Sequence, residues 1–343
     1  MKHVLIGGNG FVGRELVRRL IEEAAPQILV IDLPESFDKR PELRHDSVRY
    51  ARIDIAVPHA LDQIALDPGD VVHHLATRLI TPNKPRFGRD EYFRYCAVDG
   101  TREVLSWMKR RGARGLVFWS TDMVYGPAIE TPRRESHPRR PFGPYGRSKV
   151  AAEDLIAEAV KAGDIHCTIF RPRLILGPGR LGILEVLFKA ADMGLPMPLI
   201  GPGDNRFQFV SVADCARAAV LAAKAGCPNG IFNLGTDNSP TEYELLTGFV
   251  KQIGSNTKII RTPGWLVKSV LRLLDVLKIS PLDPEQFEIA DLEVTLDTSA
   301  AKRELGWTST QSDEELLLAA FRSYKEAKSL DHADAPAARL TAD

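Results

Sequence analysis

Short, continuous apolar runs recur along the first two-thirds of this chain, and longer segments with helical periodicity separate them. The runs predicted as strands are 4–6, 28–31, 71–75, 115–119 and 167–170. A strand that is apolar at every position is buried on both faces, and helical crossovers connect parallel strands. The sequence therefore predicts an α/β fold built on a doubly wound parallel sheet, whose ligands bind beyond the carboxyl ends of the strands.

The domain organisation follows from where this pattern stops. Residues 1–176 carry the alternation, and 205–235 contain a return to the sheet. The segments 177–204 and 236–327 are richer in Pro and Gly, so we expect them to form a smaller, mixed C-terminal lobe that binds substrate. Residues 328–343 have no apolar periodicity and are predicted to be a frayed, disordered tail.

Composition excludes several classes of protein. The 343 residues include 45 basic and 45 acidic side chains, and a formal net charge of zero argues against an overall electrostatic grip on nucleic acid. No signal-peptide core and no run of about 18 apolar residues occurs, which predicts a cytoplasmic protein without an integral membrane segment. The four cysteines form no CxxC pair, and no His, Cys and carboxylate spacing indicates a metal site.

Three glycines join the first predicted strand to the first helix. Gly7, Gly10 and Gly13 stand three residues apart, and they would permit a tight turn, a close backbone approach to a pyrophosphate and close helix–strand packing. Free N–H groups at the helix start, where Phe11 and Val12 lie, would face the anion. The strand–turn–helix context predicts a Rossmann-type dinucleotide site.

A carboxylate stands at the expected distance from this turn. Asp32 ends the second strand 22 residues after Gly10, where it could accept hydrogen bonds from both ribose hydroxyls and repel a 2′-phosphate. This favours NAD over NADP, although Lys39 and Arg40 downstream could serve a phosphate. Asp54 and Ile55 follow the next short strand, where the carboxylate could reach the adenine amino group.

A phenol and an ammonium lie four residues apart on a later helix. Tyr145 and Lys149 would share one helix face, and Lys149 is expected to lower the pKa of Tyr145 toward neutrality. Hydroxyl residues Ser120 and Thr121 follow the strand 115–119, where one could bridge the substrate oxygen and the phenol. The alternative interpretation is that these hydroxyls cap the next turn.

These segments, in this order, resemble the extended short-chain dehydrogenase/reductase superfamily, and more narrowly its NAD-dependent nucleotide-sugar epimerase/dehydratase family. Further similar segments are 72–76, 98–101, 171–179, 209–214, 233–235 and 305–307, so the resemblance covers about residues 3–325. It implies that Tyr145 is the catalytic base, Lys149 its partner and Thr121 the catalytic Ser/Thr. It also implies a homodimer formed through helices near 100–111 and 146–162.

The resemblance assigns other residues to ligands. It places Leu75, Ala76 and Thr77 at the strand end that contacts the cofactor, and Pro172 near the nicotinamide. The candidate substrate residues are Thr121, Asp122, Met123, Arg173 and Arg206.

The chain departs from the family pattern at informative positions. Met123 occupies the place of the dehydratase Glu, and a thioether is neither acid nor base, which argues against 4,6-dehydration. Ala97 replaces an Asn, and Arg173-Leu174 lacks the amide that meets a substrate diphosphate. Arg206 lies one step before the usual Arg position.

Three functions remain open from the sequence. The first is an NAD-dependent epimerase or oxidoreductase acting on a nucleotide-activated sugar. The second is a hydroxysteroid-type dehydrogenase or ketoreductase for an apolar alcohol, favoured by the missing amide and by the apolar helix 265–279, which is otherwise expected to pack on the small lobe. The third, an NAD-sensing module without catalysis, has no need of Tyr145, Lys149 and Thr121. The basic loop 133–140 is either solvated or collects an anionic substrate.

Overall fold

The computed structural model describes residues 1–79, 85, 87–180, 184–277, 279–280, 282 and 284–333. Within them, one seven-stranded sheet forms the centre of the molecule, with the order β10-β6-β5-β4-β1-β2-β3 and parallel pairing throughout. The strands are β1 (Lys2–Ile6), β2 (Gln27–Asp32), β3 (Val48–Arg52), β4 (Val71–His74), β5 (Gly115–Trp119), β6 (His166–Pro172) and β10 (Gly230–Leu234). From β1 the chain adds β2 and β3 on one side of the sheet and then β4, β5 and β6 on the other. Sheets of this kind bind ligands at this switch point, between β1 and β4.

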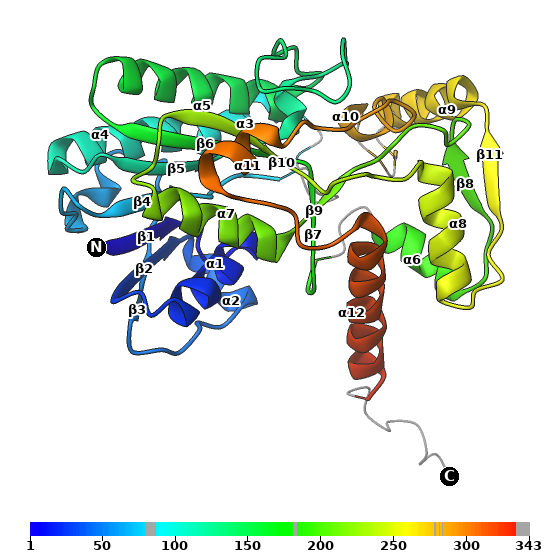
Figure 1. The fold of residues 1–343 in the computed structure, drawn as a ribbon, viewed down its shortest axis with the longest axis horizontal. Helices are drawn as coiled ribbons and strands as arrows, with labels where there is room; N and C mark the ends of the chain where they lie inside the picture. Colours follow the sequence, from blue (N-terminus) through cyan, green and yellow to red (C-terminus); the bar gives the residue numbers. More distant parts are fainter. Residues whose placement is uncertain are drawn as a thin grey trace.

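Helices cover both faces of this sheet (Figure 1). One face carries α1 (Phe11–Glu22), α7 (Val212–Lys224) and α11 (Ser299–Leu305), and the other carries α4 (Thr101–Arg111) and α5 (Pro144–Lys161). Short elements that complete this part are α2 (Pro34–Lys39), η1 (Ala60–Gln63), α3 (Arg89–Arg94), the π-helix η2 (Tyr95–Gly100) and η3 (Asp122–Val124). The predicted doubly wound, Rossmann-type α/β fold is confirmed.

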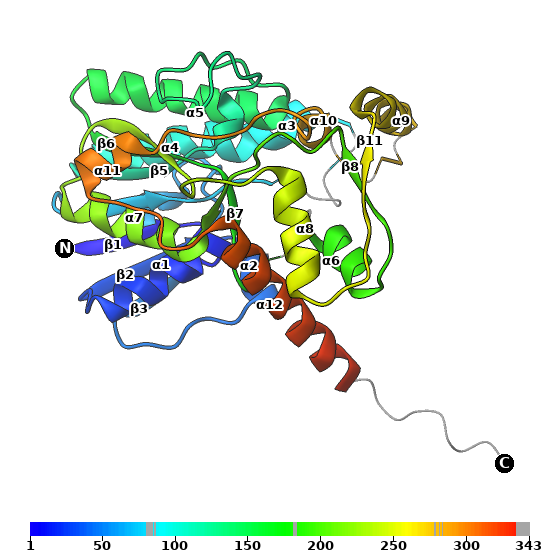
Figure 2. The same ribbon diagram turned by 45° about the vertical axis from the view of Figure 1, so that its right-hand side comes forward.

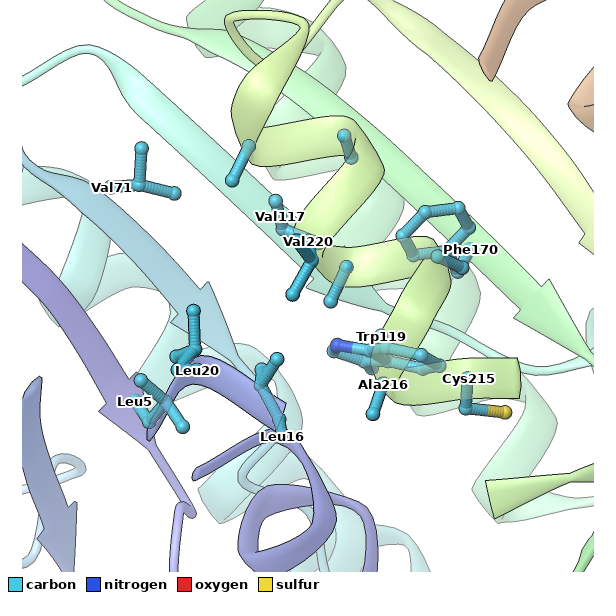
Figure 3. Packing of buried hydrophobic residues seen from close by; sticks show 14 of the residues in the cluster. Leu5, Leu16, Leu20, Val71, Val117, Trp119, Phe170, Cys215, Ala216 and Val220 are labelled. Atoms are coloured by element: carbon cyan, nitrogen blue, oxygen red, sulfur yellow. The ribbon is translucent and has the colours of Figure 1, made fainter. Parts of the chain in front are cut away.

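The apolar strands divide their side chains between two cores. In β1, Leu5 packs under α1 and α7, whereas Val4 and Ile6 point to the core beneath α4 and α5. Figure 3 shows the first of these cores, with Leu16 and Leu20 of α1 and Val220 of α7 among its members. Burial on both faces explains why the strands read as unbroken apolar runs.

A third core belongs to the C-terminal lobe. It is formed by α6 (Leu184–Asp192), β8 (Met197–Ile200), α8 (Glu242–Gln252), α12 (Asp313–Ala333) and neighbouring strands. The strands outside the large sheet pair in parallel, β11 (Ile259–Thr262) with β8, and β7 (Leu174–Leu176) with β9 (Phe209–Ser211). The sequence predicted that 205–235 returns to the central sheet. Of the two strands in this segment, β10 joins that sheet and β9 does not.

The helix α12 corrects the predicted tail. It runs to Ala333, packs against α8 and extends away from the sheet (Figure 2). Lys325 and Lys328 both pair with Asp192 of α6, which ties its distal half to the lobe. The prediction of a frayed chain is therefore wrong for 328–333, and 334–343 lie outside the described residues.

The helix α9 (Gly264–Val276) packs on the protein through only part of its apolar surface. Its inward side carries the buried Leu271 and Lys268, which pairs with Asp291, whereas Arg272 pairs with Glu288 at the surface. Its exposed apolar residues are Trp265, Leu266, Val270, Leu273 and Val276. The predicted packing of the helix on the small lobe therefore holds for Leu271 and is wrong for these five residues. No helix in the described part of the chain combines the length and apolar content needed to span a bilayer.

Candidate active site

The glycine turn after β1 is closely packed on its neighbours. Gly7 has φ +81°, and a Cβ there would lie 2.6 Å from the Ala76 backbone nitrogen at the end of β4. A Cβ on Gly13 would lie 2.5 Å from the Gly8 Cα, so α1 approaches the turn closely. Gly10 caps α1 and offers no side-chain acceptor, which leaves the N–H groups at the helix start available to an anion. This cradle fits a dinucleotide pyrophosphate.

Asp32 is connected to the same turn. Its two carboxylate oxygens accept the backbone N–H groups of Asn9 (2.9 Å) and Leu33 (2.8 Å). Burial raises the pKa of Asp32, and these two hydrogen bonds oppose the rise. Arg40 also lines the cavity described below, whereas Lys39 does not.

We expect Asp32→Asn to lower NAD affinity by about 10-fold and to reduce the preference for NAD over NADP. The amide keeps the shape but loses the charge that repels a 2′-phosphate and strengthens hydrogen bonds to ribose. Equilibrium titration with both cofactors measures the two dissociation constants. Asp38→Asn, an exposed neighbour on α2, is the matched control and should bind both cofactors like the wild type. An unchanged preference in Asp32→Asn would remove Asp32 from cofactor selection.

One cavity of about 370 Å³ opens at the carboxyl ends of the strands. It brings together every residue predicted to contact the cofactor. These residues are Gly7, Gly10, Phe11, Val12, Gly13, Asp32, Asp54, Ile55, Leu75, Ala76, Thr77, Tyr145, Lys149 and Pro172. Asp54, which is expected to reach the adenine, accepts a hydrogen bond from the Tyr95 hydroxyl at 3.0 Å.

Sequence reasoning missed several residues of this cavity. Arg78 lies 4.7 Å from the ring centres of both Tyr92 and Tyr95, and Arg180 lies 5.5 Å from that of Phe11. Arg78, Tyr95 and Arg180 all line the cavity. Arg78 follows β4 by four residues, so its place after a strand end was a signal that could have identified it.

The two proton-transfer candidates are deeply buried. The Lys149 side chain donates to the Trp119 carbonyl at 2.8 Å, and burial lowers its pKa to about 8. Burial raises the pKa of Tyr145 to about 12, against the lowering influence of Arg180 and of the Thr77 hydroxyl. The expectation that Lys149 brings the Tyr145 pKa toward neutrality is wrong for this structure, because desolvation of the phenolate outweighs the nearby cations.

The buried ammonium predicts how stability depends on pH. In the folded protein Lys149 loses its proton near pH 8, whereas its ordinary pKa is 10.5. Between these values the unfolded chain binds more protons, so the contribution of Lys149 to the free energy of unfolding rises with pH. We therefore expect Lys149→Met to be more stable than the wild type near pH 7, by a margin that shrinks toward about pH 10. Denaturant unfolding without added NAD, with the exposed Lys161→Met as control, measures this margin; a pH-independent margin would contradict it.

The two hydroxyls after β5 have different partners. Ser120 donates to Glu153 at 2.5 Å, and Glu153 forms a buried ion pair with Arg171. Thr121 accepts the Met123 N–H at 3.2 Å and donates to Asp122 at 3.3 Å, so it does cap the turn η3. Ser120 lines the large cavity, and Thr121 is the residue that follows Ser120 in the chain.

The predicted substrate residues separate into two groups. Asp122 forms a buried ion pair with Arg173 at 3.1 Å, and Asp122 and Met123 line a second, small cavity. Arg206 lies outside both cavities and donates to the Ser239 carbonyl at 2.5 Å. The structure therefore does not bring Arg206 to the other candidates.

A carboxylate that sequence reasoning missed caps α5. Glu285, on α10 (Pro284–Phe287), accepts the backbone N–H groups of Tyr145 (3.2 Å) and Gly146 (3.4 Å). Its negative charge raises the pKa of Tyr145. Glu285 also lines the small cavity beside Met123, so a segment distant in the sequence reaches the start of α5.

Comparison with known proteins agrees with this geometry. A model of the NAD dependent epimerase/dehydratase family matches residues 3–235. The chain is 25% identical over 338 residues to sterol-4-alpha-carboxylate 3-dehydrogenase, decarboxylating, of Saccharomyces cerevisiae (91% of this chain, 94% of that protein). It is 26% identical over 319 residues to dTDP-glucose 4,6-dehydratase of Streptomyces niveus (90% and 88%). A crystal structure of UDP-galactose 4-epimerase superposes with a TM-score of 0.72 at 21% identity, covering 95% of this chain and 99% of that one.

Proposed function

The chain belongs to the NAD dependent epimerase/dehydratase family, and we propose that it catalyses hydride transfer at a carbinol carbon of a nucleotide-activated sugar. The outcome is epimerisation or a net redox reaction. The names of two similar proteins, a dTDP-glucose dehydratase and a UDP-galactose epimerase, support the substrate class.

One observation carries the proposal. The glycine turn, Asp32 and the Tyr145–Lys149 pair line a single cavity, although the turn and the pair lie far apart in the chain. A module that only senses NAD would need the turn and the carboxylate, but not a buried phenol and ammonium at the other end. This favours an enzyme over a sensor.

The residues divide the chemistry between them. When bound, NAD supplies the hydride acceptor at its nicotinamide ring. Tyr145, with a pKa of about 12, is protonated at neutral pH and ready to donate a proton to a carbonyl oxygen. In the reverse direction, oxidation of the alcohol, the phenol must first lose its proton. The positive charge of Arg180 favours this loss because it lowers the pKa of Tyr145. Thr121 would hold the substrate oxygen, and Lys149 would bind the cofactor ribose.

The set of acids and bases favours reactions without water loss. Elimination needs an acid and a base at adjacent carbons, and Met123 provides neither. Asp122 is engaged by Arg173, and Glu285 by the N–H groups of α5. We therefore propose epimerisation or net oxidation, not 4,6-dehydration.

A second candidate is a hydroxysteroid-type dehydrogenase. The sterol dehydrogenase relative matches nearly its full length. Arg173 and Leu174 offer no side-chain amide where nucleotide-sugar enzymes of the resembled family bind the substrate diphosphate. A substrate without a diphosphate does not need that amide. A homodimer formed through α4 and α5, and a cytoplasmic location, remain predictions.

One assay separates these candidates. Purified protein is incubated with UDP-, GDP- and dTDP-sugars and with apolar secondary alcohols, while retained NAD, NADH and epimer formation are followed. Conversion of a nucleotide-sugar supports the proposal. NADH accumulation with apolar alcohols alone supports the second candidate, and inertness toward every compound would overturn both.

A further inference from the structure

Two arginines are buried beside the catalytic segment without enough partners. Arg133 is 2% exposed and Arg173 is 5% exposed. In each, Nε and Nη2 are buried with no hydrogen-bond partner. A guanidinium carries five N–H donors, and a buried donor left without a partner destabilises the folded protein. The sequence left open whether the loop that begins at Arg133 is solvated or collects an anion, and the burial of Arg133 excludes the solvated alternative for this residue.

The charges around the pair leave one cation without a paired carboxylate. Arg173 donates from Nη1 to Asp122, and its guanidinium stacks 4.2 Å from the ring centre of Phe207. Arg133 forms no ion pair with any of the described residues. Its pKa is raised by the negative charge of Asp122 and lowered by the positive charge of Arg173. The second carboxylate at the small cavity, Glu285, accepts N–H groups at the start of α5. Asp122 thus pairs with Arg173 alone, although its negative charge also acts on Arg133.

The position of the pair connects it to the reaction. Asp122 follows Thr121 directly, and the small cavity is lined by Asp122, Met123, Arg133 and Glu285 among others. Glu285 in turn bonds to the backbone of Tyr145. Arg133 and Asp122, the partner of Arg173, therefore line a cavity that adjoins both η3, which follows Thr121, and Glu285, which bonds to the start of α5.

We propose that Arg133 and Arg173 bind a carboxylate of the substrate, close to the carbinol on which Tyr145 acts. This rests on the proposed function and narrows its substrate class to a carboxylate-bearing alcohol, such as a uronic acid. A planar carboxylate matches the donor fork of a guanidinium, and its two oxygens can accept hydrogen bonds from the unpaired donors of the two arginines. The small cavity, about 10 Å³, holds about one water, so the flexible Met123 side chain must move as the carboxylate enters.

The first test measures anion binding without turnover. Formate serves as the probe on the full-length protein, with sodium chloride at equal ionic strength as the reference. We expect formate to raise the wild-type Tm saturably, by about 2 °C, and to leave Arg133→Met unaffected. Arg133→Met should itself melt higher than the wild type in chloride, because it removes a buried, unpaired charge. The control Arg134→Met alters an exposed neighbour that lies 3.6 Å from Asp297, and it should respond to formate like the wild type.

Other outcomes of this test contradict the proposal. A lower Tm for Arg133→Met in chloride would indicate that the guanidinium is structural. An equal formate response in the wild type and in Arg133→Met would indicate an adventitious ion effect elsewhere.

The second test compares two substrates that differ only in the carboxylate. We expect UDP-glucuronic acid to exceed UDP-glucose in kcat/KM by about 10- to 100-fold, and Arg133→Met to erase that preference by slowing only the acid. Conversion of both at equal efficiency would overturn the carboxylate site and leave the proposed function standing. Conversion of neither, with the formate response still lost in Arg133→Met, would overturn the nucleotide-sugar function and leave the carboxylate site standing.

Discussion

Replacing Tyr145 by Phe is expected to reduce turnover by about 10²- to 10⁴-fold while NAD affinity stays close to that of the wild type. The substitution removes one hydroxyl and keeps the ring, which is buried and packs edge-on against Phe93 at 5.5 Å between ring centres. Proton transfer by a positioned side chain contributes a factor of this size. Single-turnover rates and calorimetric NAD binding separate the two effects.

A matched tyrosine makes this result specific. Tyr243 lies on α8, outside the cavity, where its ring stacks 4.1 Å from the Arg261 guanidinium. Tyr243→Phe should turn over like the wild type. If Tyr145→Phe retains wild-type turnover, Tyr145 is not the proton-transfer residue.

The second large effect is expected from Gly13→Ala, which should lower the free energy of unfolding by about 3 kcal/mol and abolish measurable NAD binding. The new methyl group would lie 2.5 Å from the Gly8 Cα and 2.6 Å from the Gly7 and Gly8 carbonyl oxygens. These are backbone atoms of the turn itself, so they can give way only if α1 or the turn moves. Either movement would displace the N–H groups that are expected to meet the pyrophosphate.

The same substitution at an open position provides the control. Gly248 lies inside α8, and a Cβ there meets nothing within 4 Å. Gly248→Ala should raise the free energy of unfolding by about 0.5–1 kcal/mol, because alanine restricts the unfolded chain, and NAD binding should not change. Denaturant unfolding and NAD titration test both variants. A stable Gly13→Ala that binds NAD would contradict the close packing of the turn.

The cofactor cavity could be predicted from the sequence because its residues follow predicted strands. The carboxyl ends of parallel strands meet at one edge of a sheet, so placing Gly7, Asp32, Ala76 and Pro172 after their strands was enough to bring them together. The alternation of apolar runs and helices similarly determined the fold class, since few other arrangements bury such strands on both faces.

What the sequence could not predict depends on contacts between distant segments. Glu285 reaches Tyr145 from a C-terminal segment of the chain, and no local pattern marks that meeting. Most of the apolar surface of α9 is exposed although Leu271 is buried, and periodicity alone does not reveal which part of that surface packs. The pKa of Tyr145 depends on how completely burial removes the phenol from water. That burial results from the packing of the folded protein and not from the spacing between Tyr145 and Lys149.

A crystal structure of the protein grown with excess NAD is the most direct test of the central claim, that a dinucleotide spans the cavity from the glycine turn to Tyr145. We expect the pyrophosphate at the start of α1, the adenosine ribose against Asp32 and the nicotinamide ring beside the Tyr145 hydroxyl. An empty cavity, or a Tyr145 hydroxyl directed away from the nicotinamide, would contradict the account.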